Sequence, residues 1–88
     1  MTVATSRLHD AAVVVMAADA PPSGDRVFQL WTIHPGSDPV SASVMAVGQT
    51  AAVQVVEGVP GASDVAVTIE PKGGSAQPTT KPVADVKL

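Results

Sequence analysis

The chain has 88 residues and a net charge of −3, and at this length we expect a single domain that covers residues 1–88. Its five Lys and Arg residues are scattered, which argues against the basic surface that nucleic-acid binding needs. The longest unbroken apolar run, Ala11–Ala18, is far shorter than the roughly 20 residues that cross a bilayer. There is no cysteine, so no disulfide supports the core.

Small residues dominate the hydrophobic part of the chain. It has 16 Val and 14 Ala but only two aromatic residues, Phe28 and Trp31. Abundant Val and scarce Leu, Lys and Glu favour strands over helices. Clusters of turn-forming residues separate segments of about five to eight residues, a rhythm typical of all-β domains. We therefore predict a small antiparallel β-sandwich of about six or seven short strands, Ig-like or related.

The first two strands are predicted at Thr2–Leu8 and Ala11–Ala18, and they form a hairpin if His9 and Asp10 make a two-residue turn. Both turn residues tolerate a positive φ better than most residues do. The second strand is apolar on both faces. We therefore expect it to lie inside a sheet or to have its second face covered.

The third strand is predicted at Val27–Ile33, and it carries both aromatic residues. Alternation places Phe28 and Leu30 on one face and Trp31 on the other. Phe28 and Leu30 are expected in the core, because a core of small residues needs its bulk in one central strand. Trp31 is expected to cover the outer face beside a loop, with its indole N–H bonded to a carbonyl.

The later strands alternate between a buried and a wetter face. Within Val40–Ala46 this alternation directs Val44 inward. A short final edge strand is predicted at Val83–Leu88, where Asp85 and Lys87 shield the edge. The residues predicted for the structural core are Phe28, Leu30, Trp31, Val44, Val65, Val67 and Ile69.

The chain shows no arrangement of residues that suggests catalysis or metal binding. His9 and His34 lie in or beside predicted turns, where a solvated imidazole lacks the shelter of an oriented base. Neither has a second His or Cys at ligand spacing. The Asp residues, Asp64 among them, are isolated and are interpreted as turn residues rather than as an acid–base pair. We predict no catalytic residue, no metal site, no cofactor and no enzyme activity.

One charged residue suggests a structural role. Glu70 ends the sixth segment directly before Pro71, and its carboxylate is placed to accept backbone N–H groups of the loop Gly73–Ala76 and to pin that loop. The alternative is a solvated carboxylate at a strand end. The loop lacks the helix and the Lys of a phosphate-binding loop, so its glycines are interpreted as a turn. The candidate residues for loop pinning are Glu70, Gly73, Gly74 and Ser75.

Three segments carry a family resemblance. They are VFQLW at 27–31, PVSASV at 39–44 and DVAVTIEPKGGSAQPT at 64–79. In this order they resemble the C-terminal domain of the anti-sigma-K factor family, bacterial membrane proteins that restrain an extracytoplasmic-function sigma factor. The last segment is the most specific, and the resemblance runs from about Ala11 to Thr79. Departures are small: Phe28 stands where Tyr is more usual, Ser43 where Gly is common, and Thr80-Lys81 replaces a Gly-rich continuation.

The resemblance implies a longer parent protein. In it, a cytoplasmic anti-sigma domain and one transmembrane helix precede this module, which lies on the extracytoplasmic face of the bacterial cell membrane. The sigma factor would bind the cytoplasmic domain, which is absent here, and site-1 and intramembrane proteases would act on the parent. The module would meet the membrane only through the absent helix and would bind no nucleic acid.

Three functions without catalysis remain open. The first is a sensory or protective domain whose loosening exposes a cleavage site. The second is a module whose exposed edge, or whose loop Gly73–Thr79, captures a peptide or an envelope ligand. The third is a structural spacer.

Overall fold

The computed structural model describes all residues, 1–88, as seven β-strands without a helix. The strands are β1 (Thr2–Arg7), β2 (Ala11–Ala17), β3 (Val27–Ile33), β4 (Val40–Val44), β5 (Ala51–Glu57), β6 (Asp64–Glu70) and β7 (Ala84–Lys87). Since the chain has no helix, none of its elements is a helical membrane span.

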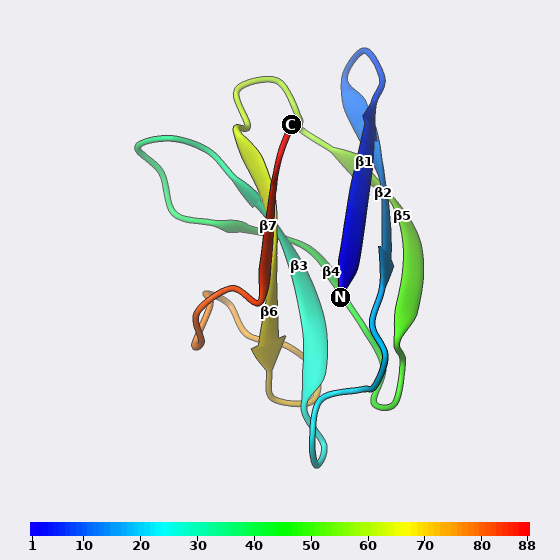
Figure 1. Cartoon of the computed structure of the whole chain (residues 1–88). Coiled ribbons are helices and arrows are strands. Elements are labelled where there is room, and N and C mark those ends of the chain that lie inside the picture. Colours follow the sequence, from blue (N-terminus) through cyan, green and yellow to red (C-terminus); the bar gives the residue numbers. More distant parts are fainter.

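The strands form two antiparallel sheets that pack face to face (Figure 1). The three-stranded sheet has the order β1-β2-β5, and the four-stranded sheet has the order β4-β3-β6-β7. The predicted antiparallel β-sandwich of about seven strands is therefore confirmed. The neighbours β1-β2-β5 and β3-β6-β7 correspond to strands A-B-E and C-F-G of the immunoglobulin sandwich.

The hairpin of β1 and β2 forms, with His9 and Asp10 between the strands. The Leu8 N–H donates to the Ala11 carbonyl oxygen at 2.7 Å beside the turn. Every non-glycine residue of the chain has a negative φ, so the turn forms without using the tolerance of His9 and Asp10 for a positive φ. The strand β2 is central in its sheet, as expected, but its second face is not fully covered, since Val15 is 45% exposed.

The core lies between the two sheets. Phe28 and Leu30 of β3 lie in it as expected, but its bulk is not confined to one strand, because Met16 of β2 and Met45 are buried there too. Ile69 packs against it while remaining partly buried. Most of the other core side chains are small. The ten residues of the core cluster are Ala12, Val14, Met16, Phe28, Leu30, Met45, Val56, Val59, Val65 and Val67.

Val44 does not belong to the core, and the expectation for it is wrong. The ladder between β3 and β4 shifts by one residue, which leaves Ala42 without a partner. Such an extra residue moves the residues after it to the opposite face of the strand. Val44 therefore lies opposite Gln29 and is 42% exposed, while Met45 is buried.

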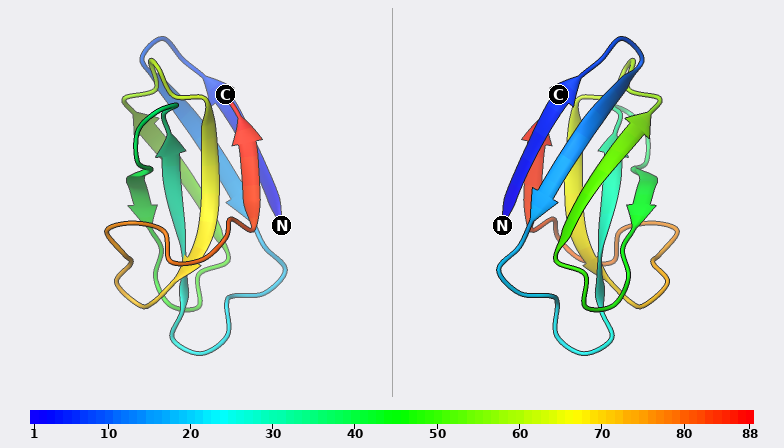
Figure 2. Two further views of the ribbon diagram at one scale, coloured as in Figure 1. Left: turned by 90° about the vertical axis from the view of Figure 1, so that its left-hand side faces the viewer. Right: turned by 90° about the vertical axis from the view of Figure 1, so that its right-hand side faces the viewer.

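The outer face of the four-stranded sheet is buried where β3 and β6 meet. Gln29 and Trp31 of β3, and Thr68 and Glu70 of β6, are each at most 1% exposed. No third sheet lies on this face. The segment 71–83, which joins β6 to β7, crosses it instead (Figure 2, left).

Candidate functional site

A buried carboxylate organises the segment 71–83. Glu70 Oε1 accepts a hydrogen bond from the Ser75 hydroxyl at 2.9 Å and another from the Thr79 hydroxyl. The Thr79 backbone N–H reaches both carboxylate oxygens at 3.2 Å. The strand β6 thus ends in an acceptor that holds the loop at Ser75 and Thr79, five and nine residues further along the chain.

These hydrogen bonds also set the charge state of Glu70. Burial raises the pKa of this carboxyl, but hydrogen bonds from Thr68, Thr79 and Ser75 favour the charged form and outweigh burial. The pKa of Glu70 therefore lies below its ordinary value. The side chain is a stably ionised acceptor with no exposed surface.

The donors differ from those that the sequence suggested. None of the backbone N–H groups of the loop Gly73–Ala76 donates to Glu70, and two of them have other acceptors: Gly74 N–H donates to the Pro71 carbonyl, and Ser75 N–H donates to Gln29 Oε1 at 2.9 Å. The Ser75 hydroxyl takes their place, and Thr79 adds contacts that the sequence analysis missed. The repeated hydroxyl residues of the QPTT stretch were the available signal.

Gln29 fixes the same loop to β3. Its Nε2 donates to the Ser75 carbonyl oxygen at 3.0 Å and to the Ser41 hydroxyl at 2.9 Å. With the bond that its Oε1 accepts, this one side chain links the loop, β3 and β4. The Gln of the QLW motif is therefore an anchoring residue.

The two loop glycines have different surroundings. Gly74 has a φ of +82° and packs so closely on Gln29 and Val44 that an added Cβ would lie 2.7 Å from Val44 Cγ2. Gly73 also has a positive φ, +87°, but an added Cβ there would meet nothing within 4 Å. Close packing therefore requires glycine at position 74, and the positive φ alone favours it at position 73.

Trp31 belongs to the same polar network. Its Nε1–H donates to the Thr68 hydroxyl at 2.8 Å, and Thr68 in turn helps to lower the pKa of Glu70. The partner is a hydroxyl rather than the expected carbonyl. The indole is fully buried and lies outside the core cluster, on the outer face of β3.

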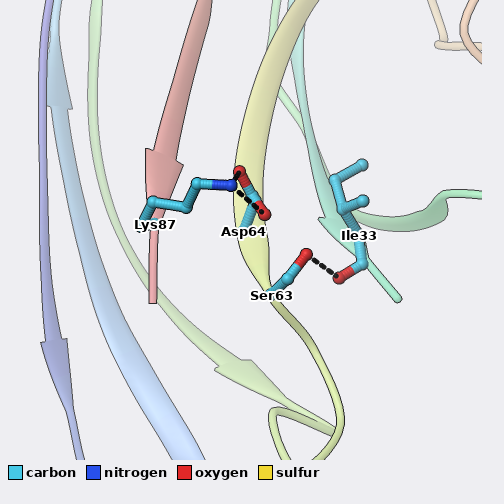
Figure 3. Close-up of polar contacts among 4 residues, drawn as sticks. All are labelled: Ile33, Ser63, Asp64 and Lys87. Atoms are coloured by element: carbon cyan, nitrogen blue, oxygen red, sulfur yellow. Dashed lines mark hydrogen bonds and ion pairs between the residues drawn. The ribbon is translucent and has the colours of Figure 1, made fainter. Parts of the chain in front are cut away.

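A second charged cluster lies at the opposite end of β6 (Figure 3). The Lys87 ammonium contacts the Asp64 carboxylate at 3.3 Å, and the Ser63 hydroxyl donates to the Ile33 carbonyl oxygen at 3.4 Å. Asp64 is the first residue of β6 and is 6% exposed, so its interpretation as a turn residue is wrong.

Asp64 and Asp85 form a pair of carboxylates that the sequence analysis did not expect. Hydrogen bonding with Asp85, together with the nearby Ser63 hydroxyl and Lys87, lowers the pKa of Asp64. The pKa of Asp85 is raised by its hydrogen bond to Asp64, by burial and by the charge of Asp64. The pair therefore shares a proton more readily than two isolated carboxyls would, and it is the register of β6 against β7 that brings the two strands' carboxyls to one face.

The structure groups no three side chains that hold a metal ion. His34 Nε2 lies 3.1 Å from the Gly58 carbonyl oxygen, and His9 is exposed beside Asp10. Both oxygens of Glu70 are engaged by loop donors. The chemistry that the Glu70 site supports is the holding of a loop.

A cavity of about 310 Å³ lies between β4 and β5, on the side of the sandwich away from the pair β1 and β7. Its lining mixes apolar and polar side chains. They are Thr32, Val40, Ser41, Ala42, Val55, Val56 and Glu57.

Comparison with known proteins gives one family. Residues 1–83 match the family described as "Anti-sigma-K factor rskA, C-terminal". The chain is 37% identical over 91 residues to the "Anti-sigma-K factor RskA" of Mycobacterium sp. (strain KMS), covering 99% of this chain and 36% of that protein. It is 35% identical over 92 residues to the protein of the same name from Mycobacterium tuberculosis (strain H37Rv), covering 99% and 38%.

A Streptomyces griseus protein, described as "Uncharacterized protein in phr 5'region", is 35% identical over 83 residues, which cover 94% of this chain and 35% of that protein. The chain thus spans little more than a third of the length of these relatives. No solved structure matches it.

Proposed function

Because the chain belongs to the anti-sigma-K factor family, and matches its C-terminal domain over residues 1–83, we propose that it is the extracytoplasmic sensory and protective domain of a membrane-embedded anti-sigma factor. The parent would restrain an extracytoplasmic-function sigma factor through a different domain, since this chain spans little more than a third of its relatives. Stepwise cleavage by site-1 and intramembrane proteases would release the sigma factor. The module itself has no catalytic role in this proposal.

The observation that carries the protective role is the way the first strand enters the fold. The strand β1 begins at Thr2 and pairs with β2 along its whole length, from Thr2 to Arg7. A membrane-proximal segment joined to Thr2 would lead directly into a paired strand. A protease can cleave at the paired strand only after that strand opens, so the stability of the sandwich would control cleavage there.

The packing supports a modest barrier to opening. Only 18 of the 88 residues are buried, so little apolar surface opposes the entropy of the unfolded chain. Phe28 and Leu30 are, with Met16 and Met45, the large side chains in a core that is otherwise Val and Ala. Truncating either removes a large share of what holds the two sheets together.

The experiment is to follow cleavage of the parent in cells that carry Phe28→Ala or Leu30→Ala. We expect faster first cleavage and higher expression of a sigma-dependent reporter. Val40→Ala is the matched control, because Val40 is 53% exposed and its truncation should change stability by less than about 0.5 kcal/mol. Unchanged cleavage in cells where the variant domain is demonstrably unfolded would contradict the protective role.

The cavity between β4 and β5 favours a second candidate, a module that binds a peptide or an envelope ligand. A chemical-shift titration of the 88-residue chain with envelope fractions tests it. A binding module gives saturable shifts at cavity residues such as Val40 and Val56. A structural spacer gives no saturable response.

A further inference from the structure

Three of the four edge strands are protected against pairing with another chain. The strand β7 has four residues and carries Asp85 and Lys87. The bulge at Ala42 interrupts β4. The strand β1 lies beside β7 of the other sheet and ends at Arg7 (Figure 2). Short length, charges and bulges are the features by which sheet edges usually avoid such pairing.

The fourth edge strand, β5, is longer than β1 and β7, has no bulge, and carries its one charge, Glu57, at its last position. It has seven residues, pairs with β2 in an unbroken register, and contains neither Pro nor any charge before Glu57. No strand lies beyond it in its sheet (Figure 2, right), and the 310 Å³ cavity separates it from β4. Its outward side chains Val53 and Val55 are 68% and 64% exposed. The β5 edge is therefore open and apolar.

We propose that this edge pairs with β5 of a second copy of the same chain, antiparallel and centred on Gln54 at a twofold axis. In that register Val53 lies opposite Val55 of the second copy, and Ala52 lies opposite Val56. The sequence AAVQVVE is thus nearly self-complementary in residue size about its centre. Cross-strand pairs of β-branched residues are the units that stabilise a sheet.

Charge is compatible with this register and disfavours two alternatives. Centred on Gln54, each Glu57 faces Ala51 of the other copy, and the two carboxylates are about 20 Å apart, well beyond the Debye length. A parallel pairing would place Glu57 beside Glu57 of the other copy. An antiparallel pairing centred on Val56 would bring the two carboxylates within two residues of each other, and like charges in either position oppose pairing.

The size of the interface indicates how strong the dimer is. One seven-residue strand adds a narrow strip to the sheet, and contacts that bury less than about 1,200 Å² belong to transient complexes. We therefore expect a reversible dimer that forms as the protein concentration rises. This proposal stands independently of the proposed function.

A disulfide trap tests the geometry, and the absence of native cysteine makes it clean. Gln54 and Thr5 both lie beside Val14, on opposite sides of the same cross-strand row. Under mild oxidation Gln54→Cys should form a covalent dimer, because the two side chains meet at the twofold axis. Thr5→Cys, on the opposite edge, should remain monomeric. Equal cross-linking of the two variants would overturn the proposal.

A charge exchange tests the register by sedimentation equilibrium. Val53→Lys, at an exposed position, should weaken the dimer at least about tenfold, as should Val55→Glu alone. Combined in one chain, Val53→Lys and Val55→Glu place opposite charges across from each other twice and should restore the dimer. A monomeric wild type at millimolar concentration, or a combined variant no tighter than the single ones, would show that β5 does not pair in this way. Circular dichroism confirms that each variant is folded.

Discussion

Thr80 and Ile69 are joined by two hydrogen bonds through a single hydroxyl. The Thr80 Oγ1 accepts from the Ile69 N–H at 3.3 Å and donates to the Ile69 carbonyl oxygen at 2.9 Å. The pairing of β6 with β7 ends at Val67 and Ala84, so Ile69 has no backbone partner in β7. The Thr80 side chain bonds to its N–H and carbonyl groups instead.

Thr80→Val should therefore destabilise the domain by about 1–3 kcal/mol, because the substitution keeps the shape but removes both hydrogen bonds to Ile69 and leaves the Ile69 N–H without its hydroxyl partner. Urea unfolding measures the effect. Thr2→Val in exposed β1 is the control, and it should stay within about 0.5 kcal/mol of the wild type. Equal effects of the two substitutions would show that the Thr80 hydroxyl contributes nothing specific.

Gly74→Ala and Gly73→Ala separate close packing from backbone conformation. Both glycines have a positive φ, so each substitution costs about 1–2 kcal/mol from the backbone alone. Only at position 74 does the new Cβ also meet Val44 and Gln29, at 2.7 and 2.9 Å. Thermal unfolding should show the larger loss for Gly74→Ala. A larger loss for Gly73→Ala would contradict the observed docking of the loop.

Glu70 makes stability depend on pH. Because its folded pKa lies below the ordinary value of 4.5, the ionised carboxylate contributes stability above pH 4.5, and this contribution is lost as the pH falls through the folded pKa. Glu70→Gln should cost about 1–3 kcal/mol at pH 7 and progressively less below pH 4.5. Urea unfolding at several pH values checks this. Glu57→Gln, at an exposed position, is the control at pH 7 and should change stability by less than about 0.5 kcal/mol.

Asp85 should act in the opposite direction. Its folded pKa is raised above 3.8, so the stability linked to its protonated form is present below pH 3.8 and is lost as the pH rises through the folded pKa. Asp85→Asn has no carboxyl to ionise and so does not lose this stability. The melting temperature of the variant minus that of the wild type should therefore rise between pH 3.5 and pH 7. Asp85→Ala should show the same pH trend, since the trend depends on removing the carboxyl. A wild type that gains on both variants over this range would refute the sharing of a proton with Asp64.

The strands and the bulk of the core were predictable because their signals are local. Alternation within Val27–Ile33 was enough to direct Phe28 and Leu30 to one face and Trp31 to the other. The side of Val44 was not predictable, because the bulge that reverses it arises from pairing with β3. Alternation within one segment cannot reveal an unpaired residue in a ladder.

The candidate site was predictable only in part, for a similar reason. Glu70 and Ser75 are close in sequence, and the structure places them in contact. The anchor at Gln29 lies 46 residues from Ser75 and depends on the course of the loop over the sheet. The contact of Asp64 with Asp85 likewise depends on the β6–β7 register, which no local pattern encodes.

The position of β2 between β1 and β5 also affects how the domain folds. Its pairing with β1 is a local hairpin, but β5 can join it only after the chain has passed through β3 and β4 of the other sheet. Long-range pairings of this kind form slowly. Until β5 docks, the uncharged segment Ala12–Ala17 presents an unpaired edge of the kind that aggregates. Refolding yield should therefore fall as protein concentration rises, because intermolecular capture of this segment competes with the arrival of β5.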